Sequence, residues 1–267
     1  MRAVFLVVFC IVFAPISAQA GMELSPLRNV LDADNRSATF TVSNPSDRIL
    51  HGRVSWIDLS ATPSGYKPAT VAARRALSAA PYFVVSPASF TLKPGSRVKI
   101  KVAMREGAKP PPGERRSHLL IETGAERTMM RRASNEGLQL DIGLGVSAPV
   151  ILRGRGTASA NIGGTKLLRD ADGVLEIATE ILPTGALSTY GRMIVDFAPA
   201  DEPGIRERLA LRNNVAGYPD AERREVIMPL GYYSLGAGEI IIRYEGASEF
   251  EGKLFEERKF DIAPPAE

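Results

Sequence analysis

Few residues of this sequence have the types and spacing of a catalytic or metal-binding site. The two histidines, His51 and His118, stand in separate strand-like segments without an HExxH motif or a cysteine nearby, so they do not predict a zinc site. We expect His118 to be a partly buried histidine of a strand. Ser64 and Lys67 have the S-x-x-K spacing of some serine hydrolases, but they lie within TPSGYKP, where turn chemistry explains them.

Phosphate and acid-base chemistry are no better supported. The segment GGTK, residues 163–166, lacks the spacing of a phosphate-binding loop. The acidic pairs 201–202 and 256–257 are typical of solvated turns and faces. The sequence therefore predicts no catalytic residue, no cofactor and no metal site, and we expect a protein that is not an enzyme.

The most informative stretch is LQLDIGLGV, residues 138–146. Its apolar side chains alternate strictly with Gln, Asp and Gly, which is the period of a strand. The apolar row consists of Leu138, Leu140, Ile142, Leu144 and Val146. Two interpretations stay open: the row fills the core of its own domain, or it is offered to another polypeptide by strand addition, in which backbone hydrogen bonds give affinity and alternate side chains give specificity. Burial by a partner would contribute about 1.5 to 3 kcal/mol for each side chain before the costs of association.

The rest of the chain supplies the elements that would position this strand. Short strands between Asn, Pro, Asp and Gly turns predict an all-β fold. Strands are expected over 38–42 and 50–57 and after the turn Lys93-Pro94-Gly95, with a short surface helix within 71–80. Beyond a linker at Gly154 to Gly156, the segments VLEIATEIL, GRMIVDFA, REVIMPLG, GEIIIRY and KLFEERKFDIA are again strand-like. We therefore expect two domains, residues 21–153 and 154–267.

The first twenty residues, MRAVFLVVFCIVFAPISAQA, have the basic start, apolar centre and small-residue end of a cleaved signal peptide. Cys10 is the only cysteine, so the mature chain is expected to leave the cytoplasm without a disulfide. The net charge of +3 and the lack of a Lys/Arg tract argue against nucleic acid as a partner. No second long apolar run follows, so we expect no membrane insertion.

The order of the segments is similar to that of the periplasmic chaperones of the chaperone-usher pathway of pilus assembly. The segments are LSPLRNVLD, SPASFTLKPGSRVKIKV, GERRSHLLIE and LQLDIGLGV, followed by Arg153. The resemblance covers the first domain and the linker. It implies two immunoglobulin-like β-sandwich domains in a boomerang arrangement, and a periplasmic protein of fimbrium biogenesis. It also implies that the protein binds pilus or fimbrial subunits by donating a strand to their incomplete fold, the known case of such strand addition, and delivers them to an outer-membrane usher.

The same resemblance implies roles for particular residues. The five alternating apolar residues from Leu138 to Val146 would be the donors. Arg28 would bind the terminal carboxylate of the subunit, because a guanidinium holds both carboxylate oxygens; the alternative is a solvated surface charge. Pro149 stands where these chaperones have a lysine partner, and Arg116 or another cation would have to replace it. Arg153 would join an interdomain salt-bridge network, unless it is an ordinary linker charge.

A function of a different class also stays open, that of a secreted structural or adhesive β-sandwich protein similar to a pilus subunit. Such a subunit carries its alternating segment at the mature N-terminus of a single short domain, whereas here the alternation lies mid-chain before a second domain. This placement favours the chaperone. The sequence leaves open whether the free protein covers its donor strand by forming a self-capping dimer.

Replacing Ile142 and Leu144 together with Asp should abolish capture of a subunit, because two charges would replace apolar side chains that a partner must bury. The protein should remain folded, as circular dichroism can check. Co-purification of a subunit from the periplasm measures capture, and capture that persists in the double variant would show that the donor assignment is wrong.

Overall fold

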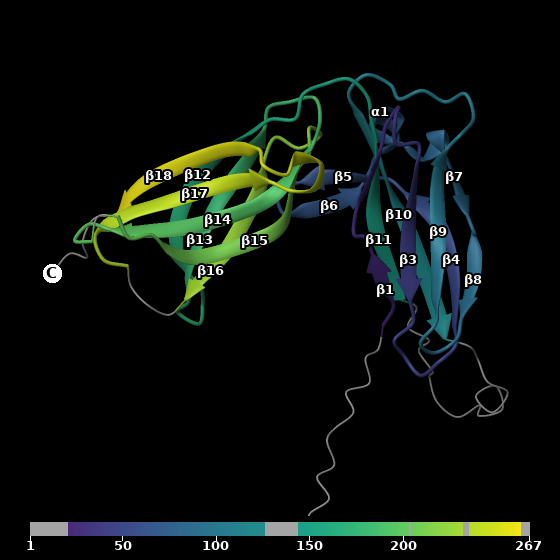
Figure 1. Cartoon of the computed structure of the whole chain (residues 1–267), viewed down its shortest axis with the longest axis horizontal. Coiled ribbons are helices and arrows are strands. Elements are labelled where there is room, and N and C mark those ends of the chain that lie inside the picture. The colour runs from purple at the N-terminus through teal and green to yellow at the C-terminus, as the bar shows by residue number, and fades with distance from the viewer. Residues whose placement is uncertain (1–20, 126–143, 203, 232–234, 263–267) are drawn as a thin grey trace, which may run out of the picture.

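The computed structural model describes residues 21–125, 144–202, 204–231 and 235–262. It shows two β-sandwich domains set at an angle and joined at one end (Figure 1). The all-β, two-domain fold predicted from the sequence is confirmed. The expected signal peptide, residues 1–20, and the donor residues Leu138, Leu140 and Ile142 lie outside the described residues.

The first domain contains most of the short elements. They are β1 (Glu23–Ser25), β2 (Asn29–Leu31), β3 (Ser37–Ser43), β4 (Leu50–Ile57), β5 (Leu59–Thr62), β6 (Gly65–Pro68), α1 (Val71–Leu77), a 3-10 turn (Ala80–Tyr82), β7 (Phe83–Ser86), β8 (Ser89–Leu92), β9 (Arg97–Met104), β10 (Glu114–Ala125) and β11 (Leu144–Arg153). The strand expected over 50–57 and the helix expected within 71–80 are thereby confirmed.

Two sheets of the first domain face each other. One has the order β1-β3-β9-β7 and the other β2-β11-β10-β4-β8. Alternate residues of each strand point inward, and Phe40, Ile100, Leu119 and Ile121 are fully buried between the sheets. Trp56, expected in the core, is half-buried and packs against it. This apolar core holds β11 as a neighbour of the central strand β10.

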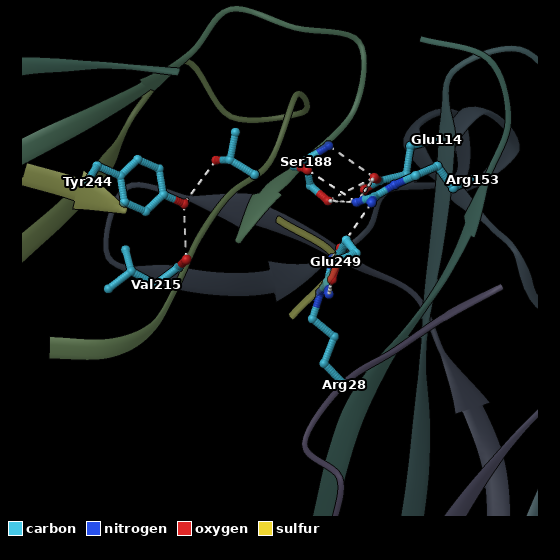
Figure 2. Close-up of polar contacts among 8 residues, drawn as sticks. Arg28, Glu114, Arg153, Ser188, Val215, Tyr244 and Glu249 are labelled. Carbon is cyan, nitrogen blue, oxygen red and sulfur yellow. Dashed lines mark hydrogen bonds and ion pairs between the residues drawn. The ribbon is translucent and has the colours of Figure 1, made fainter. Parts of the chain in front are cut away.

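The second domain is a sandwich of longer strands. They are β12 (Ala160–Arg169), β13 (Leu175–Pro183), β14 (Thr189–Pro199), β15 (Glu207–Gly217), β16 (Arg224–Gly231), β17 (Gly238–Gly246), a 3-10 turn (Ser248–Phe250) and β18 (Leu254–Ile262). The sheets have the orders β12-β13-β16 and β15-β14-β17-β18. The buried Tyr244 hydroxyl donates to the Val215 carbonyl and accepts from the Thr189 hydroxyl, and so ties β14, β15 and β17 together (Figure 2).

Two strands and a hairpin were not expected from the sequence. Strand β12 contains Gly163 and Gly164, where its register with β13 shifts, and this bulge interrupts the alternation that marks a strand. Strand β15 is polar over much of its length and contains Asn214 at a positive φ of 59°. TPSGYKP, interpreted as a turn, supplies the turn of the hairpin β5–β6 at Pro63 and Ser64 and continues into β6, and the hairpin extends towards the second domain (Figure 1).

The hairpin covers a buried polar cluster between the domains. Arg116, on the outer face of β10, donates two hydrogen bonds to the Asp220 carboxylate at 3.1 and 3.0 Å. Its guanidinium lies 3.9 Å from the centre of the Tyr218 ring. The backbone amide of Ala61 in the hairpin also donates to Asp220, at 2.8 Å. Arg116 therefore links the first domain to the second, and its side chain is committed to this contact.

His118 lies beside this cluster on the same face of β10. It is 2% exposed and makes an edge-to-face contact with Tyr66. Neither ring nitrogen has a hydrogen-bond partner. Burial, followed by the positive charge of Arg116, lowers the pKa of His118 to about 4, against an opposing effect of Asp220. The histidine is thus neutral near pH 7, and it is a strand histidine as expected, although fully rather than partly buried. Among the described residues, no helix is long and apolar enough to cross a membrane.

The stability of the protein should depend on pH through His118. Since its pKa is about 4 when folded and about 6.5 when unfolded, the unfolded chain alone gains a proton as the pH falls through this window. The wild-type free energy of unfolding should therefore fall relative to that of His118→Gln between pH 6.5 and 4, by up to roughly 3 kcal/mol. Denaturant unfolding of both proteins at several pH values measures this difference, and a difference that is independent of pH would contradict it.

Candidate functional site

Strand β11 has a free edge over its first half. It pairs with β10 from Leu144 to Arg153, but β2 joins its other side only at Val150, Ile151 and Leu152. Within the described residues, no strand pairs with that side between Leu144 and Pro149. An unpaired strand edge presents backbone donors and acceptors in the spacing that another strand requires.

The register shows which backbone groups face this edge. The amide of Val54 in β4 donates to Ala88, away from β10, so Val54 and its opposite residue Ile121 form a non-hydrogen-bonded pair. The backbone groups of Ile121 must then point to β11, where Val146 lies opposite. Because the direction alternates along a strand, the N–H and C=O groups of Gly145 and Ser147 point to the free edge.

Pro149 fits the same alternation. Like Gly145 and Ser147, it is a residue whose backbone groups point to the free edge. A sheet accommodates a proline at such a position, because its missing N–H faces away from the neighbouring strand. The residue that replaces the expected lysine therefore leaves the pairing with β10 intact. Its backbone offers the free edge only an acceptor.

The side chains of β11 divide between its two faces. Ala148, Val150 and Leu152 are buried in the core of the first domain, and the half-buried Val146 packs against that core. Leu144 begins the strand. The structure thus gives Val146, a predicted donor, contacts within its own domain, and it describes no side chain of the other four predicted donors.

Arg28 lies where the free edge ends. It directly precedes β2, whose first residue, Asn29, is opposite Val150. Both terminal nitrogens of Arg28 donate to the carboxylate of Glu249 in the second domain, at 2.9 and 2.7 Å (Figure 2). The guanidinium also lies 4.5 Å from the centre of the Tyr190 ring. The predicted carboxylate-binding residue therefore holds a carboxylate in this structure, and that carboxylate belongs to the same chain.

The same contact perturbs both ionisable groups. Burial alone would lower the pKa of Arg28, but the hydrogen bonds and charge of Glu249 outweigh it and raise this pKa. Burial would raise the pKa of Glu249, but Arg28 outweighs it and lowers that pKa. Both groups are thus charged near neutral pH.

Arg153 shares this carboxylate and links the domains at a second point. One terminal nitrogen donates to Glu249 at 2.9 Å, and the other donates to Glu114 and to Ser188 (Figure 2). The Ser188 amide and hydroxyl donate to Glu114 in turn. Arg153 thus lies in an interdomain network, the position that the resemblance implies. No sequence pattern pointed to Glu249 or Ser188, because only the tertiary fold brings their loops to the linker.

An open pocket of ≈ 360 Å³ lies over these residues. Arg28, Asn29, Arg153, Tyr190 and Glu249 contribute to its lining. The Nε atoms of Arg28 and Arg153 and the Nδ2 atom of Asn29 are buried without a hydrogen-bond partner. The cluster therefore has more N–H donors than Glu249 and its neighbours satisfy. No group of three or more His, Cys, Asp or Glu side chains that could hold a metal occurs among the described residues.

Comparisons with known proteins found similar solved structures at low sequence identity. No protein-family model and no curated protein sequence matches this chain. Similar solved structures include the SafB chaperone of Salmonella enterica in complex with the SafA pilin, which is 16% identical, with coverage of 91% of this chain and 96% of the other and a TM-score of 0.44. The CupB2 chaperone of Pseudomonas aeruginosa is 12% identical, with coverage of 91% and 100% and a TM-score of 0.44.

A third similar structure is the complex of CsuC with the tip subunit CsuE, from the archaic chaperone-usher Csu pili of Acinetobacter baumannii. It is 10% identical, with coverage of 90% of this chain and 98% of the other and a TM-score of 0.42. At these values the likeness does not establish membership of a family. The features of this chain that bear on function are the free edge of β11 and the basic cluster at its end, formed by Arg28 and Arg153.

Proposed function

We propose that this protein is a periplasmic chaperone that binds pilus or fimbrial subunits by strand addition to the free edge of β11. The observation that carries the proposal is the set of outward backbone groups at Gly145 and Ser147, which no described strand pairs. A subunit whose sandwich lacks a strand exposes unpaired edges and an apolar groove, and both invite aggregation. Pairing with β11 satisfies the backbone groups of both partners.

The apolar row of the sequence would supply the side-chain contacts. Residues 138–144 continue the alternation ahead of the core-facing residues of β11. This row of large apolar side chains would enter the apolar groove of a subunit. Backbone pairing at the edge and side-chain burial ahead of it would act on one partner strand.

The position of Arg28 gives the bound strand a direction. The free edge runs from Leu144 to Pro149 and ends where β2 begins, next to Arg28. A partner strand whose C-terminal carboxylate reaches Arg28 must therefore run parallel to β11. Such an anchor would fix the register of the added strand, because the carboxylate position determines which partner residue lies opposite Ser147.

The sequence supports a periplasmic location. The signal-like residues 1–20 support export to the periplasm. We also propose that the protein transfers the bound subunit to an outer-membrane usher, because the chaperones that the sequence resembles do so. No nucleotide is required, because a pairing less favourable than that between subunits can be replaced by the next subunit.

The variant Ser147→Pro should weaken subunit binding by about ten-fold or more, because it removes an outward N–H and places a ring at the edge. Its pairing with β10 should persist, since that amide points away from β10. The measurement is the affinity of the purified chaperone for a co-expressed pilus subunit that lacks its final strand.

Ser147→Ala is the matched control, because it removes the same side chain and keeps the amide; it should bind normally. Thermal unfolding of both variants tests the fold. Gly145→Pro removes the other amide that points to the free edge and should have the same effect as Ser147→Pro. Equal binding by the proline and alanine variants, with both folded, would overturn strand addition at this edge.

A further inference from the structure

The carboxylate of Glu249 is seated where the proposed function needs the carboxylate of a partner. Both terminal nitrogens of Arg28 bond it, and Arg153 donates to the same oxygen as one of them. A guanidinium has one such pair of terminal donors. A second carboxylate therefore cannot take the same fork while Glu249 remains there.

The loop between β17 and β18 delivers Glu249 to this position. Glu249 lies in the 3-10 turn Ser248–Phe250, and Ser248 has a positive φ of 57°, which is unfavourable for a residue other than glycine. The Glu249 side chain is 29% exposed, whereas that of Arg28 is 8% exposed. Solvent thus reaches the carboxylate more readily than the arginine, whose guanidinium lies 4.5 Å from the centre of the Tyr190 ring.

The chain also shows which cation accompanies Arg28. Pro149 brings no charge, and Arg116 is engaged with Asp220 in the separate interdomain cluster. Arg153 is the cation that shares a carboxylate with Arg28. The unpartnered Nε atoms of Arg28 and Arg153 and the Asn29 amide show that this pair has donor capacity left for an acceptor.

We infer that Glu249 is an internal placeholder for the partner's terminal carboxylate, and that Arg28 and Arg153 together bind whichever of the two is present. This inference rests on the proposed function, because it concerns the end of the same bound strand. A competitor tethered to the same chain raises the apparent dissociation constant for the partner. The apparent value equals the intrinsic value divided by the fraction of molecules in which the site is free. Displacement of Glu249 also breaks its contacts with Arg28 and Arg153, so binding of a carboxylate loosens this link between the domains.

The test uses a synthetic peptide with the sequence of the C-terminal strand that the incomplete subunit does contain. The peptide is prepared as the free acid and as the C-terminal amide. The quantity measured is the ratio of the two dissociation constants, amide over acid, for the full-length mature chaperone. In Glu249→Gln the competing charge is absent, so this ratio should rise about ten-fold above the wild-type value. In Arg28→Ala the ratio should fall towards one, because only Arg153 remains to bind the carboxylate.

The matched control is Glu251→Gln, in the same loop. Glu251 is exposed and bonds Arg192 instead of Arg28, so this variant should have the wild-type ratio. Thermal unfolding checks that each variant is folded.

The possible outcomes separate the two proposals. A wild-type ratio above one that does not rise in Glu249→Gln overturns the placeholder and leaves the anchor at Arg28 intact. A ratio of one in every variant, with binding still weakened by Ser147→Pro, overturns the anchor and the placeholder but leaves strand addition. No binding of either peptide form to any variant contradicts the proposed function as well.

Discussion

The unpaired backbone of β11 is the feature on which the rest of this structure depends. Over its first half, one side of this strand has no neighbouring strand. Its unpaired N–H and C=O groups can pair with a strand of another chain. The second domain deals with the comparable problem at β12 by different means. There, the Glu256 carboxylate accepts from the Ile162 amide, and Arg258 donates to the carbonyls of Ile162 and Gly163. Side chains thus occupy backbone groups at the bulge of β12, whereas nothing described occupies those of Gly145 and Ser147.

Two interdomain contacts hold the second domain in place relative to this edge. Arg116 and Asp220 link the hairpin side of the first domain to the second domain. Arg28 and Arg153 make the other link through Glu249. Since β2 stops the free edge beside Arg28, Arg28 and Arg153 lie at the end of that edge. The angle between the domains therefore decides how far the second domain reaches towards the free edge of β11.

The general architecture was predictable because it depends on local patterns. Alternation with a period of two located β4, β13 and β16, and the turn at Lys93, Pro94 and Gly95 separated β8 from β9. Where the alternation is interrupted, as at Gly163 and Gly164 in β12, no strand could be predicted. Local pattern likewise could not show that the hairpin β5–β6 packs against the second domain, because that contact depends on residues more than a hundred positions away.

The candidate site was predictable only in part, for a related reason. Arg28 and Arg153 stood out by their position in a resemblance, but their common partner Glu249 is 221 positions from Arg28 along the chain. The free edge itself depends on where β2 begins to pair, which is a property of register and cannot be read from composition. The sequence pattern indicated a row of apolar side chains; the structure adds the unpaired backbone behind it.

Amide hydrogen exchange along β11 tests the central claim most directly. In the free protein, the amides of Gly145 and Ser147 should exchange rapidly and those of Val146 and Ala148 slowly, because only the second pair bonds β10. On addition of a subunit that lacks its final strand, Gly145 and Ser147 should become protected while Val146 and Ala148 stay protected. Protection of Ser147 in the free protein, or its continued rapid exchange in a saturated complex, would contradict the account.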